Sequence, residues 1–79
     1  MGRKELLTKI AGVISDTLEV DASTITEETS FDELGADSFD LLELVTAFED
    51  EFGATLDDDS LQGIKTVSDA LDAVEAARG

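Results

Sequence analysis

The sequence contains no cysteine, histidine, tryptophan, tyrosine or proline. The absence of cysteine excludes a disulfide framework, a thiolate metal site and thiol chemistry. Without histidine or cysteine, no serine has the usual partner that would make it a nucleophile. The missing proline, together with the lack of repeats and low-complexity tracts, is typical of one compact unit. We therefore expect a single domain over residues 1–79 that is not an enzyme.

Basic residues are also scarce, because five Lys and Arg stand against twenty Asp and Glu, which gives a formal net charge of −15. None of the five lies between Lys9 and Lys65, an interval that holds sixteen of the acids. Such a field repels nucleic acid and anionic membranes and attracts basic protein patches. It predicts protein partners with basic surfaces, and neither nucleic acid nor membrane as a partner. A merely solubilising surface explains the acidity equally well.

No apolar run approaches the length that spans a membrane, and the N-terminal residues lack the features of a signal peptide. The opening Met1-Gly2 does not continue into a myristoylation pattern, because Leu6 stands where Ser or Thr is required. We expect a cytoplasmic, monomeric protein.

Apolar residues recur with a helical period. Their three- and four-residue spacing predicts an amphipathic helix from about residue 3 to residue 18. A second helix should begin near Asp37 or Ser38, both good N-cap residue types, and end at Gly53. Its predicted core stripe consists of Leu41, Leu44, Val45, Phe48 and Phe52. Off that stripe, on a side shared with the acids Glu43 and Asp50, lie Phe39, Leu42 and Thr46.

A long connection, residues 19–37, joins these two helices. A structureless loop of this length is uncommon in a compact domain, so we expect it to be functional or to contain a short helical turn. The isolated apolar residues that should anchor it are Val20, Ile25, Phe31 and Leu34.

Two further helices should follow Gly53. Residues 57–60 offer N-cap side chains for a short third helix that carries Leu61 and Ile64. Thr66 and Asp69 resemble a capping box that opens a fourth helix. No alternating β-branched run predicts a sheet. The expected fold is all-α: a small bundle of three main helices plus one short helix, with a long loop between the first and second helices.

Ser38 stands where the small residues Gly35 and Ala36 lead into the acidic start of the second helix, in the segment LGADSFD. The nearest lysines in the sequence are Lys9 and Lys65, so nothing close to Ser38 in the sequence can activate its hydroxyl. A phosphate on this hydroxyl would lie by a helix N-terminus, where free N–H groups and the dipole favour negative charge. We therefore interpret Ser38 as the substrate of another enzyme, although an N-cap role alone would explain the local sequence equally well.

These residues resemble the acyl carrier protein family. The similarity is carried by residues 31–40 (FDELGADSFD), continues through residues 44–45 to residues 48–53, and covers essentially the whole chain. It implies that a separate phosphopantetheinyl transferase moves 4′-phosphopantetheine from coenzyme A to Ser38, and that the thiol of this arm carries acyl groups as thioesters. The implied function is an acyl carrier, which presents its cargo to fatty-acid or related biosynthetic enzymes.

The resemblance also implies a recognition surface on the second helix. By position, its acids are Asp37, Asp40, Glu43, Glu49 and Asp50, and its apolar contacts are Phe39 and Leu42. Besides the transferase, the implied partners are acyl-transferring enzymes and fatty-acid or polyketide synthase enzymes with basic docking patches. Surface ion pairs are individually weak, so recognition should be shared among several acids and should weaken with salt.

The chain departs from the commonest family pattern at three positions. Phe39 replaces the usual Leu, Thr46 stands where Met is frequent, and Asp57 takes the place of a common Pro. A bulkier contact beside Ser38 favours a specialised synthase over the general fatty-acid enzymes. Polyketide or amino-acyl cargo is therefore an alternative within the family.

Other interpretations stay open. The chain could be an acidic helical interaction protein that is never modified. Calcium binding at residues 57–59 lacks the alternating ligand spacing and downstream Glu of an EF-hand, so we predict no metal site. The family also shelters the acyl chain between its helices, and the candidate lining residues are Leu44, Val45, Phe48, Leu56, Ile64, Ala70 and Leu71.

Overall fold

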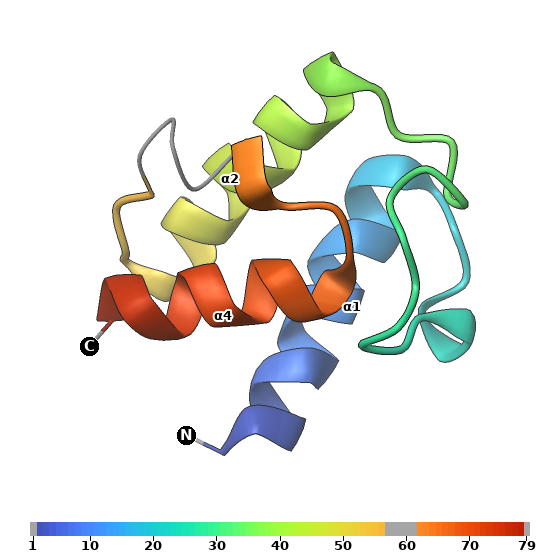
Figure 1. The fold of residues 1–79 in the computed structure, drawn as a ribbon. Coiled ribbons are helices and arrows are strands. Elements are labelled where there is room, and N and C mark those ends of the chain that lie inside the picture. The colour runs from blue at the N-terminus through green and yellow to red at the C-terminus, as the bar shows by residue number, and fades with distance from the viewer. Residues whose placement is uncertain (1, 57–61, 79) are drawn as a thin grey trace.

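The computed structural model describes residues 2–56 and 62–78. Three helices run through these ranges: α1 spans Arg3–Leu18, α2 spans Ser38–Phe52 and α4 spans Val67–Arg78 (Figure 1). No strand is found in these ranges. The all-α prediction and its three main helices are confirmed, and the observed ends of α1 and α2 match the predicted ones to within a residue.

Side-chain caps and left-handed residues set the helix ends. α2 ends at Gly53, whose φ of 63° lies in the left-handed region that glycine adopts without a Cβ penalty. The capping box predicted at the start of α4 is confirmed, because Thr66 Oγ1 accepts the Asp69 N–H at 3.3 Å and Asp69 Oδ2 accepts the Thr66 N–H at 3.1 Å. Asp69 Oδ2 also accepts the Lys65 N–H at 3.0 Å.

The short third helix is described only at its end. Residues 57–61, on which most of that prediction falls, lie outside the described residues, while Gln62 and Gly63 have helical backbone. A short helical element instead appears inside the long connection, where η1 spans Ala22–Thr24. It is capped by Asp21, which accepts the Ser23 N–H at 3.0 Å. The connection therefore contains the helical turn that its length predicted.

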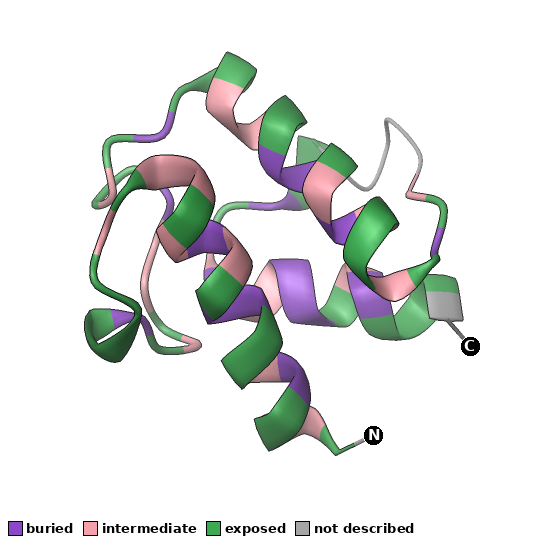
Figure 2. Cartoon of the chain, turned by 180° about the vertical axis from the view of Figure 1, so that it is seen from behind, coloured by how far each residue is buried: buried purple, intermediate pink, exposed green. Residues whose placement is uncertain are grey.

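The core lies where the inward faces of α1, α2 and α4 meet, as the buried stripes in Figure 2 show. The largest fully buried side chains are Phe31, Phe48, Leu6, Ile10, Ile14, Leu44, Leu71, Val67 and Val74. Each such side chain contributes about 1.5–3 kcal/mol through burial. In the predicted α2 stripe Leu44, Val45 and Phe48 are buried, whereas Leu41 and Phe52 are half-buried at its edge.

The second half of the long connection is tied to the residues that open α4. Its residues 27–31 run antiparallel to residues 65–68, and we refer to this pairing as the 27–31/65–68 ladder. Its three backbone hydrogen bonds join Ser68 N–H to Glu27 O at 2.9 Å, Val67 N–H to Thr29 O at 2.9 Å, and Phe31 N–H to Lys65 O at 3.0 Å. Of the predicted anchors, Ile25 and Phe31 are buried, and Val20 and Leu34 are half-buried.

None of the helices in the described ranges has the length and apolar character needed to cross a bilayer.

Candidate functional site

The start of α2 is held by a reciprocal pair of hydrogen bonds. Asp37 is the N-cap, and its Oδ1 accepts the Asp40 N–H at 2.9 Å. Asp40 Oδ2 in turn accepts the Asp37 N–H at 3.3 Å, which completes a capping box. Of the two N-cap candidates that the sequence offered, Asp37 therefore caps the helix and Ser38 is its first residue.

Ser38 is left with an exposed side chain. Its hydroxyl makes no hydrogen bond to any other described residue, because Asp37 has taken the capping role. The N–H groups of Ser38 and Phe39, in the first turn of the helix, have no intrahelical acceptor. Together with the helix dipole, they favour negative charge at this position.

A tight turn delivers the chain to this helix start. The Phe31 carbonyl accepts the Leu34 N–H at 3.1 Å and the Ala36 N–H at 3.0 Å. Gly35 has a φ of 77°, a conformation that strains residues with a Cβ. Apart from its two chain neighbours, no described residue has an atom within 4 Å of the place a Gly35 Cβ would take, so the backbone conformation favours glycine here.

A hollow of about 250 Å³ adjoins the serine and is lined by Ser38, Leu41, Gln62 and Ile64. A second hollow, of about 490 Å³, shares Leu41 and Ile64 with the first. Its other lining residues are Ser30, Phe31, Asp32, Ala36 and Lys65. Ser38 therefore borders one hollow, and that hollow shares the apolar side chains of Leu41 and Ile64 with its neighbour.

Most of the predicted chain-lining residues belong to the ordinary core. Leu44, Val45, Phe48, Ala70 and Leu71 are buried and Leu56 is half-buried, so that Ile64 alone among them lines the hollow beside Ser38. Sequence reasoning placed Leu41 only in the core stripe and did not assign Gln62. The spacing of Leu41, three residues after Ser38 and hence one turn along the same side of the helix, was a usable signal.

The outward face of α2 carries an apolar patch. Phe39 is 66% exposed and Leu42 is 51% exposed, and these are the two large apolar side chains that the described residues leave in solvent. Glu43, Thr46 and Asp50 are exposed on the same side of the helix. An apolar patch bordered by carboxylates is typical of a protein contact surface.

Glu49 differs from the other predicted recognition acids. Its carboxylate Oε2 accepts the Leu56 N–H at 2.8 Å, and the side chain is half-buried. The Glu49 carbonyl accepts the N–H groups of Gly53 and, at 3.2 Å, of Ala54. Glu49 therefore shapes the turn that follows α2. The structure brings the remaining predicted residues, Asp37, Phe39, Asp40, Leu42, Glu43 and Asp50, to exposed or partly exposed positions along the helix.

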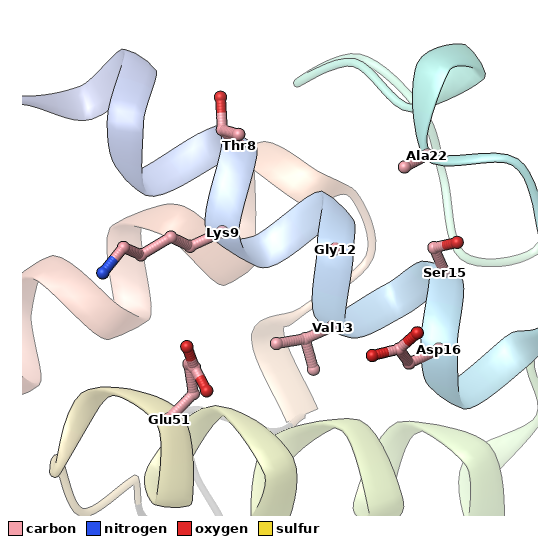
Figure 3. Close-up of a pocket in the computed structure, with 8 residues that line it drawn as sticks. All are labelled: Thr8, Lys9, Gly12, Val13, Ser15, Asp16, Ala22 and Glu51. Carbon is pink, nitrogen blue, oxygen red and sulfur yellow. The ribbon is translucent and has the colours of Figure 1, made fainter.

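A third hollow, of about 480 Å³, lies between α1, η1 and the last turn of α2 (Figure 3). Lys9 and Glu51 extend into it from opposite helices, and Asp16 lies at its other end. It contains none of the residues predicted to carry cargo or to contact a partner. Within the described residues there is also no group of three or more potential metal ligands, and residues 57–59 lie outside them.

Comparisons with known proteins agree with this geometry. A family model described as a phosphopantetheine attachment site matches residues 8–74. The acyl carrier protein of Lactobacillus acidophilus is 45% identical over 80 residues, which cover 100% of both chains. The crystal structure of the acyl carrier protein from Thermotoga maritima superposes with a TM-score of 0.84 at 39% identity, covering 95% of this chain and 88% of that one.

A chain in the solved structure of the ishigamide ketosynthase/chain length factor also superposes, with a TM-score of 0.78 at 31% identity. That match covers 95% of this chain and 96% of the other.

Proposed function

The chain belongs to the acyl carrier protein family, and from this membership we propose that Ser38 is the residue that bears the 4′-phosphopantetheine arm. When bound, the arm supplies a thiol that carries acyl groups as thioesters. The proposal rests on one observation at the start of α2: Asp37 caps the helix, so that the Ser38 hydroxyl stays exposed.

The surroundings of Ser38 fit a phosphate ester with a long substituent. The N–H groups of Ser38 and Phe39 face outward from the helix N-terminus, where they can donate to a phosphate. Leu41 and Ile64 offer apolar surface directly beside the hydroxyl. Acyl carrier proteins are carriers, and we expect no catalysis by this chain. Among the described residues, the carboxyl groups with a lowered pKa are Asp21 and Asp69, and both accept hydrogen bonds at helix starts.

We further propose that the outward face of α2 docks onto partner enzymes. Phe39 and Leu42 would enter an apolar depression, while Glu43 and Asp50 would pair with Lys or Arg around it. The expected partners are a phosphopantetheinyl transferase and acyl-transferring or synthase enzymes with basic patches. A cytoplasmic location and a monomeric state stay predictions.

A specialised synthase is a second candidate partner class, and two observations favour it. One structural neighbour belongs to a ketosynthase/chain length factor structure. Phe39, which is 66% exposed and directly follows Ser38, presents a larger contact than Leu would. If Phe39 selects the partner, Phe39→Leu should shift binding from a polyketide-type ketosynthase toward a fatty-acid ketosynthase. If the wild type and Phe39→Leu bound each enzyme with equal affinity, Phe39 would not select the partner, and fatty-acid synthesis would stay the better assignment.

The attachment proposal is tested by intact-mass spectrometry. Unmodified protein is incubated with coenzyme A and a broad-specificity phosphopantetheinyl transferase, and a single phosphopantetheine increment is expected. Ser38→Ala should abolish the increment, whereas Ser23→Ala, which removes another exposed serine, should retain it. An increment that survives Ser38→Ala would put the arm on another residue and refute the assignment of Ser38. A product without any increment would favour an unmodified interaction protein.

A further inference from the structure

Arg3, in the first turn of α1, ties three segments of the chain together. Its guanidinium reaches the long connection at Glu27 and reaches α4 at Ser68, Asp72 and Glu75. The shortest distances are 2.8 Å to Glu27 Oε1, 3.1 Å to Ser68 Oγ, 3.0 Å to Asp72 Oδ1 and 2.6 Å to Glu75 Oε1. All three ion pairs formed among the side chains of residues 2–56 and 62–77 involve this one residue.

Two of these contacts, to Glu27 and Ser68, reach one hydrogen-bonded residue pair of the 27–31/65–68 ladder, which we call the Glu27–Ser68 rung. The Ser68 N–H donates to the Glu27 carbonyl at 2.9 Å, and Arg3 holds the side chains of the same two residues. Arg3 Nε and Nη2 both lie within 2.9 Å of Glu27 Oε1, while Nη2 also donates to Ser68 Oγ. The planar fork of a guanidinium suits such a shared contact, which a single ammonium cannot reproduce.

From this rung a chain of backbone hydrogen bonds continues to the turn before Ser38. Val67 N–H donates to the Thr29 carbonyl, and Phe31 N–H donates to the Lys65 carbonyl. The Phe31 carbonyl then accepts the Ala36 N–H at 3.0 Å, two residues before the serine. Phe31 and Lys65 also line the second hollow, and the adjacent Ile64 lines both that hollow and the one beside Ser38.

We propose that Arg3 is a positioning residue for the Ser38 site. By holding Glu27 next to Ser68, the guanidinium keeps the ladder closed. It thereby fixes the turn at Phe31 and the wall of the second hollow formed by Ile64 and Lys65, of which Ile64 also lines the hollow beside Ser38. The Arg3 side chain is 36% exposed and that of Glu27 is 40% exposed, so salt screens this contact. Salt should therefore loosen the ladder even though it relieves the repulsion of a chain with a net charge of −15.

The significance of this wall rests on the proposed function, but the coupling itself is present in the unmodified chain. The test therefore uses the unmodified, full-length, ¹⁵N-labelled protein and measures native-state amide hydrogen exchange by NMR. A negative exchange result would refute the role of Arg3 only. The attachment of an arm to Ser38 is tested separately, by intact-mass spectrometry.

Arg3→Gln is compared with Lys4→Gln, which removes the same charge from an exposed neighbour on α1. In Arg3→Gln, exchange at the amides of Ser68, Phe31 and Ala36 should accelerate about two- to tenfold relative to the amide of Leu44 in α2. That range corresponds to the loss of a few half-exposed ion pairs. Lys4→Gln should leave the ratio unchanged.

Three further measurements sharpen the result. Added NaCl should raise the same exchange ratio in the wild type but not in Arg3→Gln. Arg3→Lys, which keeps the charge but lacks the fork, should restore the ratio only in part. Ser68→Ala removes one acceptor of Arg3 and should give a smaller effect of the same pattern, which keeps the proposal testable if Arg3→Gln does not fold.

Two outcomes would overturn the proposal. Equal acceleration at the ladder and at Leu44 would mean that Arg3 only stabilises the whole fold. Acceleration that stops at Ser68, without reaching Phe31 and Ala36, would mean that the contact is local and does not position the site.

Discussion

Replacing Asp37 by Ala, which removes the capping oxygen, should destabilise α2, whereas replacing the neighbouring Ser38 by Ala should not. Asp37 Oδ1 satisfies the Asp40 N–H at 2.9 Å, and replacing an N-cap acid by Ala costs about 1 kcal/mol, within a range of roughly 0.5–2 kcal/mol. In a domain of this size, that loss lowers the melting temperature by about 4–8 °C. Ser38→Ala deletes a hydroxyl without a described partner, so its effect should stay within about 0.5 kcal/mol.

Urea and thermal unfolding followed by circular dichroism measure both effects. With an m-value of about 1 kcal/mol/M, Asp37→Ala should lower the urea midpoint by about 1 M. Asp37→Asn is the matched control, because Asn caps a helix about as well as Asp and should leave the midpoint near the wild-type value. If Ser38→Ala were as destabilising as Asp37→Ala, the serine would share the capping role and would not be the free hydroxyl described above.

Three other outcomes are expected. Phe39→Ala and Leu42→Ala should each weaken binding to a partner enzyme about tenfold or more, as measured by calorimetry. The melting temperature should change little, because both side chains are largely in solvent. The control Glu5→Gln, an exposed change on α1, should leave binding unchanged. The backbone N–H bonds of Lys65 and then Thr66 lower the pKa of Asp69 below its unfolded value of about 3.9, so its stabilisation is present well above pH 4 and is lost as the pH falls through the lower folded pKa. The difference in melting temperature between wild type and Asp69→Asn should shrink accordingly on acidification, and a difference that grew would contradict this assignment. Added NaCl should raise the melting temperature of the wild type, because the net charge of −15 makes repulsion the larger electrostatic effect, and a flat or falling response would count against it.

The helices were predictable because their determinants are local. The capping box of α4 lies within four residues, and the glycine that ends α2 directly follows its last turn. The apolar period likewise identified Phe39 and Leu42 as lying off the core stripe, and both are exposed. The choice between Asp37 and Ser38 as the N-cap was beyond sequence reasoning, since both residue types cap helices well and the backbone conformation decides between them.

Contacts between distant residues could not be predicted in the same way. Arg3 meets Glu27, Asp72 and Glu75 across 24, 69 and 72 positions of the chain, and no local pattern encodes that meeting. The sequence shows only that acids far outnumber cations, so it does not tell which acids pair with a given cation. The contact of Glu49 with the Leu56 N–H was missed for a related reason, because helical periodicity describes the helix and not the turn that follows it.

The structure also changes how the acids nearest Ser38 should be tested for recognition. Asp37 and Asp40 hold one another in the capping box, so their side chains are already ordered before a partner arrives. When these two acids pair with a cation of the partner, they therefore lose little side-chain entropy, whereas Glu43 and Asp50 must be ordered on binding. Substitution by Ala at Asp37 would confuse lost charge with a frayed helix start, but Asp37→Asn keeps the cap and removes only the charge. Weaker partner binding by Asp37→Asn at unchanged stability would therefore assign recognition to the charge itself, and unchanged binding would confine Asp37 to capping.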